Sequence, residues 1–200
     1  MHFKTGEKAI INNVSGIKPT EQKAKVLWMT GLSGSGKTTL ALALNKLLLK
    51  QGFRTRIFDG DELRKGLCRD LGYTNDDRKE NIRRAAELSK IFLDSGIIVL
   101  CCFISPTNEI RELAKEIIGN DNYIEVFVDC PLDVCEKRDV KGFYKMARNG
   151  NVKNFTGIDS LYEAPKKSDI IINTDILTLK KSAEKLLDFV LPLLTKKAVK

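Results

Sequence analysis

The stretch MTGLSGSGKTTLALAL, residues 29–44, places three glycines and a lysine between two apolar runs. The pattern G-x-x-x-x-G-K-[ST], whose backbone N–H groups surround phosphates, is matched by Gly31, Gly36, Lys37 and Thr38. Glycine lets the chain pass close to an anion, and a helix that begins beside it directs free N–H groups at the same charge. A strand-like run before the glycines and a helical run after them are the context that this motif requires and that an ordinary glycine turn lacks. The stretch therefore predicts a nucleotide-binding site at a strand-to-helix turn.

The motif also predicts roles for individual positions. We expect Lys37 to reach the terminal phosphates and the hydroxyl of Thr38 to bind a Mg²⁺ ion that bridges the outer phosphates. The other positions predicted to contact the nucleotide are Gly31, Leu32, Ser33, Gly34, Ser35, Gly36 and Thr39.

Length and composition favour a single α/β domain. The chain has 200 residues, of which 42% are hydrophobic, and we expect an N-terminal extension over residues 1–24 and one domain over residues 25–200. No apolar run is long enough to span a bilayer, and the first residues lack the apolar block of a secretory signal, so a cytoplasmic location is expected. The five cysteines are odd in number and two are adjacent, which favours reduced, buried thiols. With His2 as its one histidine, the chain offers neither a Ser-His-Asp set nor a zinc site.

Strand-like and helical patterns alternate along the chain, which predicts a mainly parallel sheet of five strands. An amphipathic pattern over residues 77–95 predicts a helix, and residues 174–195 predict a helix that closes the domain. The five strands are expected at residues 26–30, 54–58, 97–103, 123–129 and 169–173.

Two carboxylates follow the second predicted strand, at the sheet edge where ligands bind in open α/β folds. Phosphoryl transfer needs a group that orients the acceptor hydroxyl or takes its proton, and the chain offers no suitable histidine for this role. We therefore assign Asp61 to the acceptor hydroxyl and Asp59 to the neighbourhood of the metal. The alternative is that both residues only form the turn.

Arginines and aromatic residues near this turn suit an anionic, base-containing acceptor. Arg64 and Arg78 are candidates to hold it, because a guanidinium pairs with phosphate-like oxygens through two N–H groups. Tyr73 and Phe155 are candidates to enclose a base, although isolated aromatic residues more often belong to the core. Asn81 shares the surface of Arg78 on the predicted helix.

The net charge of +8 is concentrated in the termini and in residues 137–153, KRDVKGFYKMARNGNVK. Lysine and arginine interspersed with glycine and asparagine suggest a mobile flap that meets phosphates. A solvated helix face is the alternative.

Four longer stretches carry a family resemblance. They are FDGDELRKGLCRDLGYTNDDRKENIRR (58–84), IIVLCCFISP (97–106), VFVDCPLDVCEKRDVKGFYKMARNG (126–150) and VKNFTGIDSLYEAP (152–165). In this order they resemble the adenylylsulfate kinase family over about residues 25–175. The family uses ATP and Mg²⁺ to phosphorylate the 3′-hydroxyl of adenosine 5′-phosphosulfate (APS), which gives 3′-phosphoadenylyl sulfate (PAPS) for sulfate assimilation. The resemblance implies the same reaction, catalysed on a three-layer P-loop NTP hydrolase-like sandwich with a mobile lid over about residues 132–157.

The resemblance also implies site residues. Arg138 and Arg148 would lie in the lid over the ATP phosphates, and Ser105 would match the serine treated in the family as a phosphoserine intermediate. A serine that only lines the pocket is the alternative, because direct transfer from ATP needs no covalent stage. The acceptor would contact Asp59, Asp61, Arg64, Tyr73, Arg78, Asn81, Ile104, Ser105, Lys153 and Phe155.

The sequence departs from the family at Tyr73, where phenylalanine is common, at Glu62, where asparagine is usual, and at Thr107, where an aromatic residue is common. Glu62 adds negative charge near an anionic acceptor, so affinity for the acceptor is the property most exposed to these changes. As a free-standing kinase, the protein is expected to form a homodimer and to act with a separate ATP sulfurylase. The competing hypotheses are a kinase for another nucleotide or small hydroxyl compound, and a nucleotide-dependent switch or nucleic-acid-binding module that uses the basic flap on RNA. The lack of a recognisable RNA-binding motif counts against the last, and we expect neither a nucleic-acid nor a membrane partner.

Overall fold

The computed structural model describes residues 20–196. Most of the expected N-terminal extension, including His2, therefore lies outside the described residues. Within residues 20–196 no helix has both the length and the apolar character needed to cross a membrane. All five cysteines are buried and none forms a disulfide, as predicted.

A five-stranded, fully parallel sheet forms the centre of the protein, with strand order β2-β3-β1-β4-β5. This confirms the sheet predicted from the alternating pattern, and the observed ends differ from the predicted ones by a residue or so. The strands are β1 (Val26–Thr30), β2 (Thr55–Asp59), β3 (Ile98–Cys102), β4 (Tyr123–Asp129) and β5 (Ile170–Asn173).

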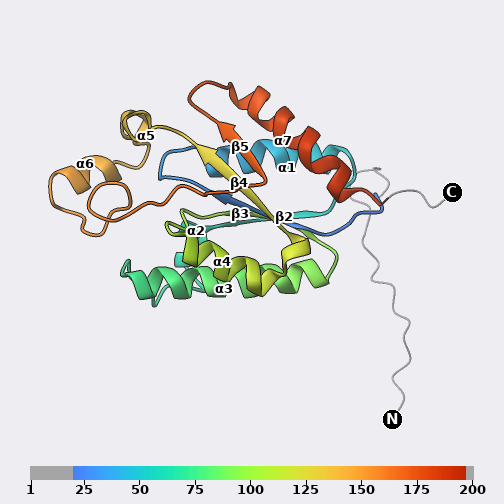
Figure 1. The fold of residues 1–200 in the computed structure, drawn as a ribbon, viewed down its shortest axis with the longest axis horizontal. Helices are drawn as coiled ribbons and strands as arrows, with labels where there is room; N and C mark the ends of the chain where they lie inside the picture. The colour runs from blue at the N-terminus through green and yellow to red at the C-terminus, as the bar shows by residue number, and fades with distance from the viewer. Residues whose placement is uncertain (1–19, 197–200) are drawn as a thin grey trace, which may run out of the picture.

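Helices cover both faces of the sheet and complete the predicted three layers (Figure 1). Helices α1 (Lys37–Lys50) and α7 (Leu179–Leu194) lie on one face, and α3 (Asn75–Asp94) and α4 (Asn108–Ile118) lie on the other. Successive residues of β1 serve opposite faces, because side chains alternate along a strand. Leu27 and Met29 therefore join the core beneath α1 and α7, whereas Trp28 joins the core beneath α3 and α4.

Two helix starts differ from the sequence prediction. Helix α3 begins at Asn75, earlier than predicted, because Thr74 and Asp77 form a capping box that satisfies free N–H groups of the first turn. Helix α7 begins only at Leu179, after the cap residue Thr178, so the predicted start at residue 174 is wrong. Thr174 instead bonds to β4 and to the phosphate loop, since its amide donates to Asp129 O (3.0 Å) and its hydroxyl to Ser35 O (2.7 Å).

Three short helices lie at the carboxyl end of the sheet. Helix α2 (Gly60–Arg64) follows β2, while α5 (Leu132–Arg138) and α6 (Phe143–Arg148) project beyond the sheet at the left of Figure 1. The last two belong to residues 132–157, which we call the lid segment. At the start of β4 lies the 3₁₀ helix η1 (Asn120–Asn122). The movement predicted for the lid segment stays a prediction.

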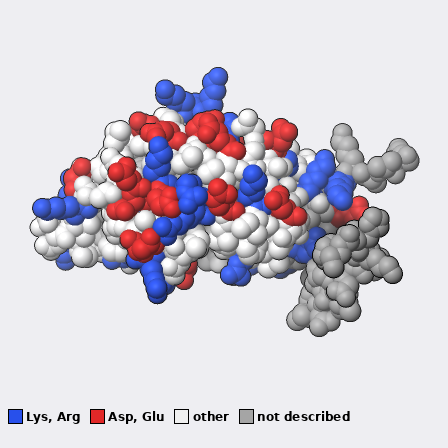
Figure 2. Space-filling view, turned by 90° about the horizontal axis from the view of Figure 1, so that it is seen from below, with Lys and Arg blue, Asp and Glu red and all other residues white. Residues whose placement is uncertain are grey.

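The surface formed by α3 and α4 mixes charges of both signs (Figure 2). Arg84 pairs with Asp70 and Glu80, and Lys79 pairs with Glu109. On this face, Figure 2 shows acidic side chains between the basic ones rather than a continuous basic stripe. That arrangement gives no support to the nucleic-acid hypothesis, which needs a basic footprint.

Candidate active site

The phosphate loop connects β1 to α1 and is built from residues that no larger side chain replaces easily. Gly31 lies so close to β4 that a Cβ atom on it would meet Val128 O at 2.5 Å, and its φ is +153°. Gly36, with φ +97°, is the residue from which α1 starts, so the loop enters the helix in a left-handed conformation that glycine tolerates. The free N–H groups of α1 therefore point into the space at the carboxyl edge of the sheet.

Lys37 is largely buried at the base of this loop, with 9% of its surface exposed. Its Nζ donates to the carbonyl oxygens of Gly31 (2.9 Å) and Leu32 (2.7 Å). Burial lowers the pKa of the Lys37 ammonium to about 8. A phosphate would supply negative charge to this ammonium, so the side chain is placed to exchange its carbonyl partners for a nucleotide.

The two predicted magnesium ligands lie next to each other. The hydroxyl of Thr38 donates to Asp59 Oδ2 at 2.5 Å, and the other oxygen of the Asp59 carboxylate accepts from the amide of Asp61 at 2.9 Å. Hydroxyl and carboxylate oxygens are the ligands that Mg²⁺ prefers. Since Mg²⁺ in kinases is usually held by one or two protein groups together with substrate phosphates and water, the Thr38 hydroxyl and the Asp59 carboxylate fit such an ion.

Asp61 lines the cleft and forms an ion pair with Lys141, which lines it too. Lys141 belongs to the turn between α5 and α6, so this contact joins the lid segment to the Asp-Gly-Asp turn after β2. The sequence reasoning missed Lys141 as an individual residue, although it lies in the basic stretch that was expected to meet phosphates. Its partner is 80 residues away in the chain, and no local pattern signals such a pairing.

Arg64 and Arg78 both lie close to the ring of Tyr73, and all three residues line the cleft. The two guanidinium carbons lie 4.5 Å and 5.8 Å from the centre of this ring. Arg78 is buried. Its pKa is lowered, mainly by this burial and to a smaller extent by the positive charge of the neighbouring Arg64. Within residues 20–196 both guanidinium groups donate to backbone carbonyl oxygens, and two cations this close together suit an anionic ligand. Asn81 is buried beside them, and its Nδ2 has no protein partner within the described residues.

Arg138 reaches the phosphate loop from the end of α5. Its Nη2 donates to Thr174 O at 2.7 Å, and its Nη1 lies 3.4 Å from Gly34 O. The guanidinium thus lies between the loop and the turn that precedes α7, and its contact with ATP stays a prediction.

The structure brings most of the predicted residues to one cleft of about 560 Å³. The predicted residues that line it are Ser33, Gly34, Gly36, Lys37, Thr38, Thr39, Asp59, Asp61, Arg64, Tyr73, Arg78, Asn81, Ile104, Ser105 and Arg138. Residues that sequence reasoning did not single out also line it, among them Cys102, Phe103, Lys141, Tyr144, Thr174, Leu177 and Ser182. Most of these come from strand ends and loops that meet only in the folded chain.

Other predicted residues lie outside the lining of this cleft. Arg148 pairs with Glu136 on the lid segment, and Lys153 is exposed. Phe155 packs edge-on against Tyr144, with ring centres 4.9 Å apart. Their contacts with a ligand stay predictions, as do those of Gly31, Leu32 and Ser35 within the phosphate loop.

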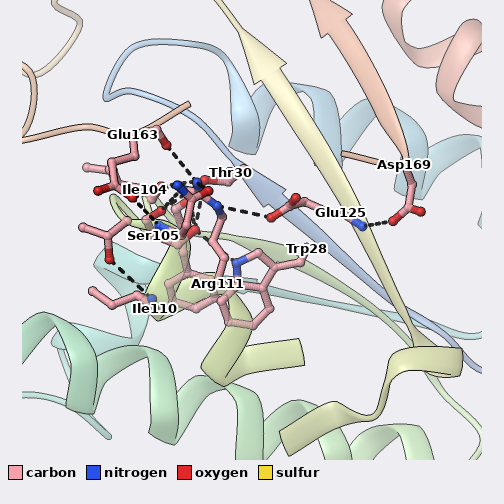
Figure 3. Close-up of polar contacts among 12 residues, drawn as sticks. Trp28, Thr30, Ile104, Ser105, Ile110, Arg111, Glu125, Glu163 and Asp169 are labelled. Carbon is pink, nitrogen blue, oxygen red and sulfur yellow. Dashed lines mark hydrogen bonds and ion pairs between the residues drawn. The ribbon is translucent and has the colours of Figure 1, made fainter. Parts of the chain in front are cut away.

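Ser105 lies in the segment that follows β3, with 2% of its surface exposed (Figure 3). Its hydroxyl accepts from Trp28 Nε1 (3.1 Å) and donates to Thr30 Oγ1 (3.0 Å). Neither partner is a base that would activate a nucleophile. The phosphoserine role stays a prediction, and the observed contacts favour the alternative of a serine that shapes the pocket wall.

A phosphate loop, an adjacent hydroxyl–carboxylate pair and a separate arginine pair are the parts expected of a P-loop kinase. Residues 23–173 match the adenylylsulphate kinase family. The adenylyl-sulfate kinase of Bacteroides thetaiotaomicron is 53% identical to the chain, and the match covers 88% of each protein. That of Clostridium acetobutylicum is 52% identical, and the match covers 86% of each protein. A solved structure of Mycobacterium tuberculosis APS kinase in complex with AMPPNP and APS is 40% identical, has a TM-score of 0.81, and is matched over 86% of this chain and 99% of that one. The chain belongs to the adenylylsulphate kinase family and is an ATP-dependent kinase.

Proposed function

We propose that this protein transfers the γ-phosphate of ATP to the 3′-hydroxyl of APS and so forms PAPS. The observation that carries this proposal is that the Arg64–Arg78 pair and the phosphate loop line one and the same cleft. A kinase needs one anion site for the donor, and a second site of this charge suits an acceptor that is itself anionic. Membership of the family and the APS-bound M. tuberculosis relative support APS as that acceptor.

On the donor side, Lys37 and the amides of the phosphate loop hold the phosphates of ATP. Arg138 adds a guanidinium above the same loop. Both cations offset the negative charge that spreads over the transferred group in the transition state. The nucleoside is expected beyond Arg138, where Thr174, Leu177 and Ser182 continue the cleft.

Mg²⁺ is expected to bind Thr38 and Asp59 when ATP is present, and it would supply charge neutralisation between the outer phosphates. The 2.5 Å contact between the two side chains supports this assignment, because both oxygens already point at one place. Asp61 lies two residues further on and orients the acceptor hydroxyl or takes its proton. For Asp61 to do so, Lys141 must release the carboxylate, after which its ammonium is free for the transferred phosphoryl group.

On the acceptor side, Arg64 and Arg78 bind the phosphosulfate and Asn81 supplies a free donor. Tyr73 is 55% exposed and carries Arg64 on its ring, which leaves the rest of the aromatic surface for the base. Transfer is direct from ATP to the hydroxyl, since the Ser105 hydroxyl is committed to Trp28 and Thr30.

The test uses ATP labelled in the γ-phosphate, with Mg²⁺ and APS, and follows labelled PAPS. Asp61→Asn should reduce turnover by a hundredfold or more, as is typical for loss of a catalytic acid or base. Asp76→Asn, an exposed carboxylate in the first turn of α3, is the matched control and should leave turnover unchanged. If APS stays unlabelled while another hydroxyl compound is phosphorylated, the kinase stands and the proposed acceptor is wrong.

Arg78→Met distinguishes the two halves of the cleft. It should raise KM for APS with little effect on KM for ATP, because Arg78 is remote from the phosphate loop in the proposed arrangement. An equal rise in both constants would contradict the assignment of Arg78 to the acceptor.

The remaining proposals concern the surroundings of the reaction. We infer a homodimer and a separate ATP sulfurylase as the source of APS from the family resemblance, and a cytoplasmic location from the lack of an apolar run long enough to span a bilayer. Analytical ultracentrifugation of the purified chain tests the first, and a single species with the mass of one chain would contradict it.

A further inference from the structure

Arg111 is a buried cation that the proposed reaction does not use. It lies in the first turn of α4 with 3% of its surface exposed. Its Nε pairs with Glu125 Oε1 of β4 at 3.3 Å, which places an ion pair inside the protein (Figure 3). A buried pair of this kind is costly to desolvate and rarely adds much stability by itself. Its position next to the cleft wall therefore calls for a functional explanation.

The rest of the Arg111 guanidinium holds backbone at the edge of the cleft. Nη1 donates to Ser105 O at 2.7 Å, and Nη2 donates to Glu163 O at 2.8 Å. The amide of Glu163 in turn donates to Pro106 O at 2.8 Å. One side chain thus joins the segment after β3 to the segment that follows the lid (Figure 3).

The segment that Arg111 holds is strained. Ser105 has φ +39°, a left-handed conformation that costs a non-glycine residue energy. Among residues 20–196, Asn154 is the other non-glycine residue with a φ above +20°, at +58°. Each has its carbonyl bound by a buried guanidinium, Ser105 by Arg111 and Asn154 by Arg78.

We propose that Arg111 is a positioning residue for the acceptor: it holds Ile104–Ser105–Pro106 in the strained conformation that shapes the acceptor wall of the cleft. These three residues line the cleft, whereas Arg111 does not. The proposal rests on the proposed function for the identity of the acceptor. It requires that loss of the guanidinium relax Ser105 and weaken binding of APS while the phosphate loop keeps its shape.

Two variants separate positioning from folding. Arg111→Lys keeps the charge but loses the planar fork that reaches Ser105, Glu163 and Glu125 together. The paired change Arg111→Met/Glu125→Leu removes both charges and leaves neither one buried alone, a replacement that commonly preserves the fold. Ile118→Ala is the control. Ile118 is buried in the same helix, at the end away from Arg111, so its truncation should lower stability without changing the cleft wall.

Steady-state kinetics give the first readout. We expect both Arg111 variants to raise KM for APS at least tenfold and to change KM for ATP less than twofold. Ile118→Ala should leave both constants unchanged at a similarly lowered Tm. Arg111 variants whose constants match those of Ile118→Ala would overturn the proposal.

The second readout needs no substrate. Trp28 is the single tryptophan of the sequence, and its indole N–H donates to the hydroxyl of Ser105. Hydrogen exchange of this N–H, followed by NMR, should be at least tenfold faster in both Arg111 variants than in Ile118→Ala. Equal exchange would overturn the proposal. If the wild-type enzyme does not phosphorylate APS, the proposed function fails, and the exchange measurement still decides whether Arg111 holds Ser105.

Discussion

The ionisation of Lys37 should make ATP binding depend on pH in a range where few other groups titrate. In the free enzyme burial lowers the pKa of Lys37 to about 8, although Cys102, Cys135, Asp59 and Asp61 each act in the opposite direction. Burial raises the pKa of the Cys102 thiol and, to about 12, that of Cys135, so neither loses its proton near pH 8. Bound phosphate requires the ammonium form of Lys37, because its function is to neutralise negative charge.

The size of the effect follows from this pKa. Above pH 8 the free enzyme carries a neutral Lys37, so each ATP that binds must bring about the uptake of one proton. With a pKa of about 8 in the free enzyme and one well above the working range in the complex, linkage predicts that Kd for ATP rises about 25-fold between pH 7.5 and pH 9.5. The range starts above the pKa of a terminal phosphate, so ATP itself does not change charge.

Calorimetric titration of ATP in buffers with different ionisation enthalpies measures both the affinity and the proton uptake. Lys37→Arg should bind with an affinity that is constant over this range, because a guanidinium stays charged. Lys37→Met should bind weakly at every pH. A wild-type affinity that is constant from pH 7.5 to 9.5, or a Lys37→Arg variant with the wild-type slope, would refute the reasoning.

The same pKa has a consequence for stability. Since the pKa of Lys37 is lower in the folded state than its ordinary 10.5, the unfolded chain binds the extra proton between about pH 8 and 10.5. The free energy of unfolding of the free enzyme should therefore gain a contribution that grows with pH in this window, and Lys37→Met should lack it.

Three further predictions concern separate parts of the molecule. Lys141→Met should lower kcat about tenfold or more. Its Tm should stay unchanged, since an exposed ion pair contributes little to stability. The control Lys145→Met, on the exposed side of α6, should leave kcat unaltered, and equal kcat values in the two variants would show that Lys141 is not part of the site. Gly31→Ala should lower the Tm by several degrees, because its backbone conformation alone costs a non-glycine residue about 1–3 kcal/mol and the new Cβ would meet Val128 O. The control Gly66→Ala should leave the Tm nearly unchanged, because a Cβ at Gly66 would have open space around it. Hydrogen bonds from two arginines of α3 lower the pKa of Glu80 to about 2. The contribution of Glu80 to the free energy of unfolding is therefore present above about pH 4.5 and is lost as the pH falls toward 2. The stability of Glu80→Gln should depend less steeply on pH in this window, and a profile identical to that of the wild type would contradict the pairing.

Local patterns were sufficient for the parallel sheet and the phosphate loop. Hydrophobic periodicity and glycine spacing act over a few residues, so the strands and the turn before α1 follow from the chain itself. The start of α7 did not follow, because hydrogen bonds from Thr174 to Asp129 and Ser35 hold residues that would otherwise extend the helix. The candidate site followed in large part, since Lys37 and Asp61 each lie at the end of a predicted strand or in the loop after it.

What the sequence could not predict is which distant groups meet. The partners Asp61 and Lys141 are 80 residues apart, and Arg138 and Thr174 are 36 apart. Phe155, whose contact with the acceptor stays a prediction, packs against Tyr144, which lies 11 residues earlier in the chain. Each of these contacts depends on how the lid segment folds back over the sheet.

The sequence by itself determined the class of chemistry, because a phosphate site needs only a short glycine loop and a helix start, both of which are local. It also determined that a carboxylate and an arginine pair follow at the correct sheet edge, because parallel strands all end there. Only the tertiary structure decided that the Ser105 hydroxyl turns inward to Trp28 and that Arg111 holds the neighbouring backbone. Those outcomes depend on burial, which makes a charged or strained group tolerable only where partners from several elements converge on it.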